Sequence, residues 1–192
     1  PVSGALTPLS GAPPPRPKAP QPGKPTAVDS APQAGQGLSA TDILKAGIAK
    51  IDITPTKPVT LSGYGSRKGL SQSIHDPLSA RAVAFEQNGK HLVLVSTDII
   101  GFYGNLAETF RKTIMEACRL EPSELFLSAI HTHSAPTPTL DCVKGHTNNV
   151  EYTKSLEEKL ISVVQEAISS AVSVQIGTGL GTSPVGINRR EV

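Results

Sequence analysis

The order of strand-like and helix-like stretches constrains this chain most, because after a proline-rich beginning it leaves few folds open. Residues 43–54 alternate apolar and polar side chains up to a Thr-Pro pair, which predicts a strand. Apolar runs at 80–86 and 91–97 flank an Asn-Gly dipeptide, a strong signal for a β-hairpin. Residues 105–118 then carry apolar side chains at helical spacing, with Asn105 available as the N-cap.

The second half of the chain repeats a strand, helix and strand order. The patterns predict a strand over 125–130, a helix from about 150 to 172 and a strand over 173–178. Strands joined through a helix in βαβ units are parallel, so these two strands and the strand at 91–97 should end at one edge of the sheet. We therefore expect an α/β domain over residues 41–192, with a mixed, partly parallel sheet and flanking helices.

Residues 1–40 should form a disordered tail or linker. The first 37 residues hold ten of the seventeen prolines and few large apolar side chains. Such a segment cannot bury enough apolar surface to offset the entropy lost on ordering, and its prolines favour polyproline II. The chain starts at Pro1 without a methionine, and proline-rich spacers are common behind removed targeting segments. We therefore expect a secreted or periplasmic protein.

Composition argues against two kinds of partner. The net charge is only +2, the cations are scattered, and 4% of the residues are aromatic, so a surface for nucleic acid is not expected. No stretch reaches the roughly 18 apolar residues that a transmembrane helix needs. We therefore expect neither a nucleic-acid partner nor a transmembrane segment.

The most informative motif is His-Thr-His-Ser at residues 131–134, directly after the strand predicted over 125–130. His131 and His133 are two positions apart, so on extended backbone their imidazoles share one face. Open α/β sheets place their ligands at the carboxyl ends of the strands. Two neutral imidazoles there suit a zinc ion, or one metal ligand beside one acid–base group.

Other polar residues should lie near the same edge. Asp98 follows one predicted strand, and Arg189 lies beyond the last one. Asp98 also fits a turn cap or a carboxylate that orients a histidine. His75 precedes Asp76, which is typical of a loop histidine held by its neighbour. Ser134 is a weak candidate nucleophile, because no Gly-x-Ser-x-Gly turn surrounds it.

Six stretches of the sequence, in this order, resemble the neutral/alkaline non-lysosomal ceramidases: AGIAKIDITP, LSGYGS, IHDPLSARAVAF, GKHLVLVSTDIIGF, LFLSAIHTHSAP and GINRR. The resemblance covers residues 46–192 and implies a zinc-dependent amidase that hydrolyses the N-acyl bond of ceramide. It implies that His131 binds zinc, that His133 assists at the reacting centre and that Arg189 lies near the substrate. The substrate-binding residues that we expect are Asn188, Asp98 and His75.

The resemblance also implies one zinc ion whose remaining ligands, another His, a Glu and a Tyr, lie beyond Val192. We therefore expect an N-terminal fragment or subunit of an enzyme for ceramide or a related N-acyl lipid, with a downstream chain or subunit completing the site. Two stretches depart from the family pattern: the Ala-Pro-Thr-Pro-Thr after the histidine motif, and the Asn188-Arg-Arg-Glu run where the family has Asn-Arg-Ser-Pro. The alternative is a non-catalytic α/β binding or interaction module that keeps the ceramidase scaffold.

Overall fold

The structure is a computed structural model that describes residues 43–181. The proline-rich tail and the residues Asn188 and Arg189 lie outside the described residues. The strands are β1 (Lys45–Asp52), β2 (Ser79–Gln87), β3 (Lys90–Thr97), β4 (Leu125–Ala129) and β5 (Val172–Ser173), and the helices are α1 (Asn105–Cys118) and α2 (Thr147–Ser169).

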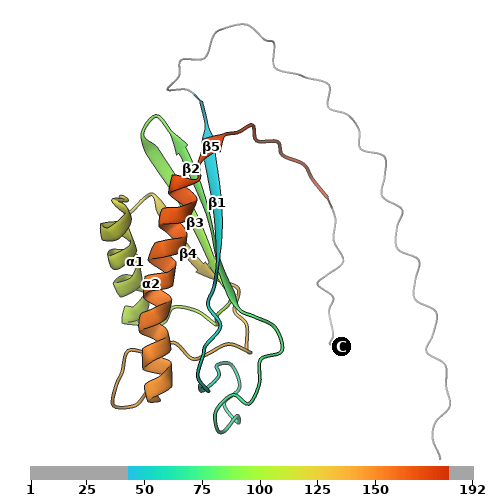
Figure 1. Ribbon diagram of the computed structural model, residues 1–192, viewed down its shortest axis with the longest axis vertical. Coiled ribbons are helices and arrows are strands. Elements are labelled where there is room, and N and C mark those ends of the chain that lie inside the picture. The colour runs from blue at the N-terminus through green and yellow to red at the C-terminus, as the bar shows by residue number, and fades with distance from the viewer. Residues whose placement is uncertain (1–42, 182–192) are drawn as a thin grey trace, which may run out of the picture. The chain divides into compact units, whose positions relative to one another are not determined.

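These strands form one mixed sheet in the order β4-β3-β2-β1-β5 (Figure 1). The β3–β4 pair is parallel and the other pairs are antiparallel, so the expected mixed, partly parallel sheet is confirmed. The β2–β3 hairpin turns at Asn88 and Gly89, which have φ angles of 53° and 72°. Two central residues with positive φ are what the type I′ turn requires, and Asn-Gly supplies them at low cost.

The last strand differs from the prediction. β5 has only two residues and pairs antiparallel with the start of β1, Lys45 opposite Ser173. It therefore runs against β3 and β4, and only these two of the three predicted strands end at the same edge. The alternating pattern misled because no partner buries it: Val172 and Ile176 are both exposed. The expectation that Arg189 shares an edge of the sheet with the histidines therefore loses its support from the strand order. The predicted position of Arg189 rests on the family resemblance alone.

The helices begin and end close to their predicted bounds, but the N-cap of α1 differs from the prediction. Asn105 is the first residue of α1, and the N-cap is Gly104, with φ of 55° and no side-chain cap hydrogen bond. α2 begins at Thr147, somewhat earlier than predicted, because the ring of His146 accepts a hydrogen bond from the Asn148 N–H. This is the usual way in which a side chain satisfies a free N–H at a helix start.

Both helices pack on one face of the sheet, which we call the inner face (Figure 1). Small side chains allow this packing: Ala80, Ala82 and Ala84 are buried in the middle of the sheet. At Gly47 a Cβ atom would lie only 2.0 Å from the carbonyl oxygen of Ala167 in α2. Close approach of α2 therefore requires glycine there. Within residues 43–181, no helix is long and apolar enough to cross a membrane.

The loops that matter for function gather at one end of the sheet, which we call the loop end. β3 and β4 both finish there, with Thr97 opposite Ala129. β1 runs in the same direction as β3, because each is antiparallel to β2. The segments after β1, β3 and β4 therefore meet at the loop end, in the lower part of Figure 1.

Candidate functional site

His131 lies at the loop end, two residues after β4. Its backbone has φ of 61°, in the left-handed region that residues with a Cβ rarely adopt. Its Nδ1 lies 2.8 Å from the carbonyl oxygen of Ile100, which can only accept a hydrogen bond. Nδ1 therefore carries the proton, and the lone pair is on Nε2. A histidine held through one nitrogen by a backbone carbonyl is the common arrangement for a metal ligand.

The second imidazole of the motif lies beside the first. The ring centroids of His131 and His133 are 5.2 Å apart, and the ring planes are inclined by 63°. His131 is exposed and His133 is half-buried. The backbone between them is not the regular strand that the two-residue spacing assumes, since His131 is left-handed. The prediction that the two imidazoles stand together nevertheless agrees with the geometry.

A loop far away in sequence fixes the backbone of the motif. We call residues 60–67 the clamp loop. Its Ser62 N–H donates to the Ala135 carbonyl oxygen over 3.0 Å, and Thr60 accepts from the Thr137 N–H over 2.9 Å. An isolated antiparallel bridge joins Leu61 to the segment after the histidines. On its other side the motif contacts the segment that follows β3, where the Ile99 carbonyl oxygen accepts from the Thr132 N–H over 3.3 Å.

Arg67 connects the clamp loop directly to the second histidine. Its Nη1 donates to the carbonyl oxygen of His133 over 3.0 Å and to that of Ser62 over 3.1 Å. Its guanidinium carbon also lies 4.9 Å from the ring centroid of Tyr64, within the range of a cation–π contact. The Tyr64 ring meets the His133 ring edge-on at 5.1 Å. Arg67 and Tyr64 together hold both the backbone and the ring of His133.

Gly63 is a functional residue of the clamp loop that the sequence pattern did not predict. A Cβ atom on Gly63 would lie 2.2 Å from Cγ of His133, and φ of Gly63 is 102°. Either fact alone disfavours a side chain, and together they make glycine necessary. The glycines of Leu-Ser-Gly-Tyr-Gly-Ser were the available signal, but sequence could not show that one of them faces a histidine.

Both carboxylate oxygens of Asp98 accept hydrogen bonds from neighbouring residues. Its Oδ2 accepts from the N–H and the hydroxyl of Ser79, both over 2.9 Å. Its Oδ1 accepts from Nη1 of Arg81 over 3.2 Å, and the Asp98 side chain is only 14% exposed. The carboxylate thus fixes the start of β2 to the end of β3, and these partners belong to the neighbouring strand rather than to the turn that Asp98 was expected to cap. Its contact with substrate stays a prediction.

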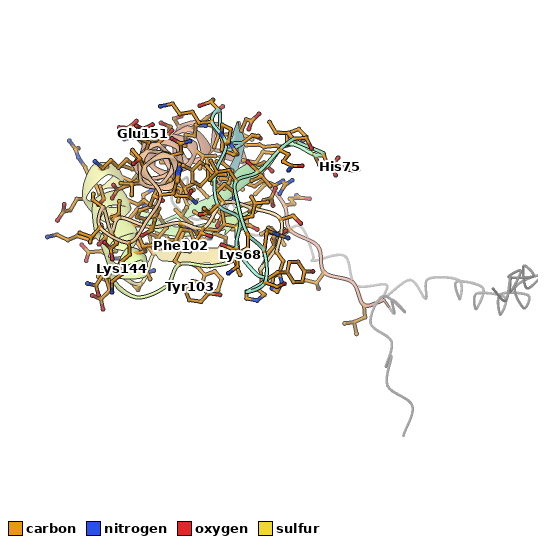
Figure 2. The ribbon with its side chains drawn as sticks, turned by 90° about the horizontal axis from the view of Figure 1, so that it is seen from below. Lys68, His75, Phe102, Tyr103, Lys144 and Glu151 are labelled. Carbon is orange, nitrogen blue, oxygen red and sulfur yellow. The ribbon has the colours of Figure 1, made fainter. Side chains whose placement is uncertain are left out.

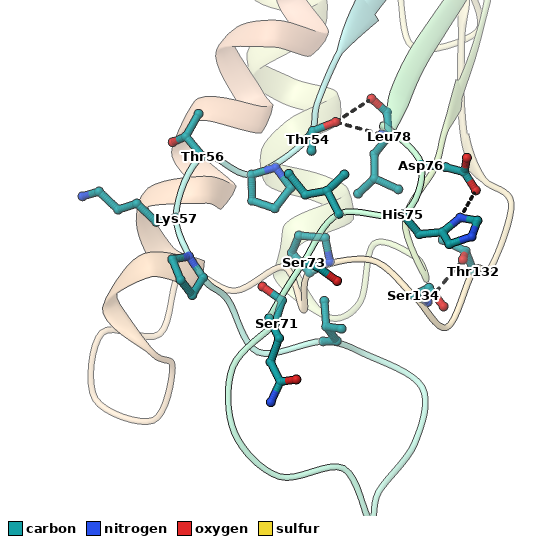
Figure 3. A pocket seen from close by; sticks show the side chains of 16 residues that line it. Thr54, Thr56, Lys57, Ser71, Ser73, His75, Asp76, Leu78, Thr132 and Ser134 are labelled. Carbon is teal, nitrogen blue, oxygen red and sulfur yellow. Dashed lines mark hydrogen bonds and ion pairs between the residues drawn. The ribbon is translucent and has the colours of Figure 1, made fainter.

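His75 lies on a different surface of the loop end. Its Nδ1 is 2.7 Å from Oδ2 of Asp76, so the predicted pairing with that neighbour is present, and its side chain is 96% exposed. It lines a cavity of about 480 Å³ together with Thr132 and Ser134 of the motif (Figure 3). The Ser134 hydroxyl has no hydrogen bond to a histidine among the described residues. That gives no support to a serine nucleophile.

A second, shallower cavity of about 350 Å³ adjoins His131. Apolar side chains dominate its wall, among them Phe102 and Leu127. Arg111 also lines it, but its guanidinium donates to the carbonyl oxygens of Leu125 and Pro122. Seen from the loop end, His75 projects on one side of the molecule, well away from Phe102 (Figure 2). The two cavities therefore approach the motif from different sides.

The ligand set for a metal is incomplete in the described part of the chain. Residues 43–181 contain no group of three or more His, Cys, Asp or Glu side chains that could hold an ion. A catalytic zinc normally has three protein ligands. His131, with a free Nε2, fits one of them. Asn188 and Arg189, the other predicted site residues, lie outside the described residues.

Comparison with known proteins identifies the scaffold. The family model described as "Neutral/alkaline non-lysosomal ceramidase, N-terminal" matches residues 44–183, most of the chain. The chain belongs to this ceramidase family. No curated protein sequence matched.

Two solved structures resemble the fold. One is the neutral ceramidase from Pseudomonas aeruginosa, with a TM-score of 0.53 and 20% sequence identity. The other is described as a ceramidase complexed with C2, with a TM-score of 0.52 and 21% identity. Each match covers 68% of this chain and 22% of the solved one. This ceramidase-family chain therefore spans about a fifth of the length of those proteins.

Proposed function

We propose that this chain carries the N-terminal part of the active site of a zinc-dependent amidase, which hydrolyses the N-acyl bond of ceramide or a related N-acyl lipid. One observation carries the proposal. The proton on Nδ1 of His131 is held by the Ile100 carbonyl oxygen, so Nε2 is available as a ligand beside a second, clamped imidazole. Family membership supports the hydrolase assignment.

In this proposal the residues of the chain divide the work. His131 would hold the zinc through Nε2, and zinc, when bound, supplies a Lewis acid that polarises the substrate carbonyl. His133 would accept or give the proton that the reacting group exchanges, a role that an imidazole suits near neutral pH. Arg189, near the substrate in the family, would stabilise negative charge on oxygen.

The surroundings of His131 are compatible with a lipid substrate. The cavity beside it is lined largely by apolar side chains, including Phe102, Leu127 and Ala129. An alkyl chain placed there would leave water without losing a hydrogen bond. His75, Asp98 and Asn188 remain our proposed contacts to the polar part of the substrate.

The proposal requires a second piece of polypeptide. The described residues supply too few ligands, and the similar solved chains are much longer than this one. We propose that the missing ligands come from a downstream chain or subunit, and that the protein acts outside the cytoplasm, as a secreted or periplasmic enzyme. One or two ligands alone should bind zinc only weakly.

Elemental analysis tests the proposal. We call this chain together with the downstream chain or subunit the completed protein. We expect it to carry one zinc ion and to release fatty acid from ceramide, and we expect His131→Ala to lose both. Thr132→Ala, which changes the residue between the histidines but removes no imidazole, is the matched control. A completed protein without metal, or full activity in His131→Ala, would refute the proposal.

The alternative is a non-catalytic binding or interaction module. The observation in its favour is that residues 43–181 lack a three-ligand group. It predicts that the chain binds an acyl lipid without turnover and that a chelator leaves this binding unchanged. Equal lipid affinity with and without chelator, with no product from the completed protein, would favour this alternative.

A further inference from the structure

Asn149, the third residue of α2, is a fully buried polar side chain at the loop end, where α2 begins (Figure 1). Its Nδ2 donates to the carbonyl oxygens of Thr60 and Thr137, both over 2.9 Å. Its Oδ1 accepts from the Thr60 N–H over 2.8 Å. A buried amide costs free energy unless it is hydrogen-bonded, and these bonds satisfy most of its capacity. The hydrogen bonds, and not an apolar surface, therefore explain why Asn149 is buried.

The chemistry of the partners fixes the orientation of this amide. Carbonyl oxygens can only accept a hydrogen bond, and a backbone N–H can only donate one. The Nδ2 group must therefore face Thr60 and Thr137, and Oδ1 must face the Thr60 N–H. An aspartate of the same size would instead place an oxygen against both carbonyl oxygens. The position thus requires a side chain that donates two hydrogen bonds and accepts one.

The partners of Asn149 belong to the two segments that hold the second histidine of the motif. Thr60 begins the clamp loop, and Thr137 lies in the segment that follows the motif. These two residues also bond to each other, since the Thr137 N–H donates to the Thr60 carbonyl oxygen over 2.9 Å. The clamp loop in turn holds His133, because Arg67 donates to the His133 carbonyl oxygen. Asn149 therefore attaches both segments to α2, which packs on β1 and β2.

The two histidines of the motif are held by different parts of the fold. The ring of His131 is held from the segment after β3, through the Ile100 carbonyl oxygen. The ring and backbone of His133 are held from the clamp loop. The separation of the two ring centroids, 5.2 Å, therefore depends on where the clamp loop lies relative to β3. Asn149 is the buried contact that fixes the clamp loop to the helix layer.

We infer that Asn149 is a positioning residue, which places the imidazole of His133 relative to that of His131. It acts through the clamp loop and touches neither ring. Its effect on a reaction rests on the proposed function, whereas its effect on the placement of the rings does not. Loss of the amide should turn His133 away and leave His131 in place, because the contact between His131 and Ile100 does not involve α2.

Nuclear magnetic resonance of the histidine rings tests the placement in this chain alone, without zinc. In Asn149→Ala we expect the ring signals of His133 to shift or broaden, because the edge-on contact with Tyr64 changes. The ring signals of His131 should move much less. A general loss of stability would not distinguish the two rings in this way.

Two further variants separate placement from folding. Val163→Ala trims a fully buried side chain about four turns further along α2, so it lowers stability without touching the loop end. It should leave the His133 signals unchanged. Asn149→Ser is milder than Asn149→Ala, because it keeps a hydroxyl and leaves space for a water molecule beside the freed carbonyl oxygens. It should move the same His133 signals by a smaller amount.

Kinetics of the completed protein test the consequence for the reaction. Asn149→Ala and Asn149→Ser should both retain the zinc, since His131 keeps its place. Both should lower kcat, the alanine variant by about 10- to 100-fold, with KM nearly unchanged. A completed protein without amidase activity even as wild type would refute the proposed function. The ring signals would still decide the inference about placement.

Four results would overturn the inference. The first is unchanged His133 signals in a folded Asn149 variant. The second is an equal shift of the His131 and His133 signals, or the same His133 shift in Val163→Ala, since either indicates loosening of the whole domain. The third is wild-type kcat in a folded Asn149→Ala protein that retains its zinc. The fourth is failure of both Asn149 variants to fold, which would assign the residue to folding.

Discussion

The histidine pair of the motif and the single His75 both lie at the loop end, but they are held in very different ways. His131 and His133 are fixed from several directions: a carbonyl holds one ring, and an arginine, a tyrosine and a glycine enclose the other. His75, in contrast, is 96% exposed, and within residues 43–181 its hydrogen-bond partner is its neighbour Asp76 in a long loop. An exposed pair of this kind contributes little to stability.

The difference separates two side chains that are already held in position from one whose position is not yet fixed. Groups that act on a reacting atom must be positioned before the substrate arrives, which requires rigid neighbours. The histidine motif meets this requirement within the described residues. His75 has no such support there, so any precise role for it depends on contacts made by substrate or by further polypeptide.

The largest expected effect comes from removing the imidazole of His131. In the completed enzyme His131→Ala should lower activity more than about 100-fold, because even partners that only orient a metal ligand contribute 10- to 100-fold. His131→Gly should lose as much activity. Since φ at this position is 61°, the glycine variant should be about 1 kcal/mol more stable than the alanine variant. Activity assays and urea denaturation measure the two effects.

Equal stability of the two His131 variants would show that the left-handed backbone carries no strain. Activity that survives in either variant would remove His131 from the metal site. Either result would weaken the distinction between the fixed pair, His131 and His133, and the unfixed His75.

Gly63→Ala should give the next largest effect. The new methyl group would collide with His133, so the ring must move or the clamp loop must open, at a cost of about 2–3 kcal/mol. We expect activity of the completed enzyme to fall more than about tenfold. Gly65→Ala is the matched control, because no atom lies within 4 Å of a Cβ at that position. Similar behaviour of the two variants in denaturation and activity would contradict the proposed contact.

The location of His131 and His133 could be predicted from the sequence, but the residues that hold them in place could not. The apolar run before His131 predicted β4, and the helix between β3 and β4 required them to be parallel, so the motif and Asp98 had to reach the same edge. The contacts of Gly63 and Arg67 join residues about 70 positions apart, and no local pattern reports such pairs. They depend on how the loops pack.

The error at β5 has a different physical origin. Alternation in residues 173–178 predicted a parallel strand, yet the observed pairing is two residues long and exposed. Alternation specifies the register of a strand only where one face is buried. Val172 and Ile176 are both exposed. Periodicity was therefore reliable for α1, α2 and the hairpin, which bury a face, and unreliable at this edge.

Arg67→Met tests the contact between the clamp loop and His133, and its expected effect on activity and stability is smaller. Methionine keeps much of the apolar stem but loses the hydrogen bonds to the Ser62 and His133 carbonyl oxygens. We expect a stability loss of about 1–2 kcal/mol and activity reduced about 10-fold, mainly in kcat. Lys68→Met, at the adjacent exposed lysine, should leave both unchanged. A variant that is less stable but fully active would restrict Arg67 to a folding role.

His75→Ala should have the smallest effect on the fold. The side chain is almost fully exposed and its pairing with Asp76 is solvated, so the free energy of unfolding should change by less than about 0.5 kcal/mol. If His75 contacts substrate, the same variant should still raise KM or lower kcat of the completed enzyme. Asp76→Ala, which removes only the neighbour of the ring, should cause a smaller kinetic change. Unchanged kinetics in both variants would leave catalysis to the fixed histidines and assign His75 to the surface of its loop.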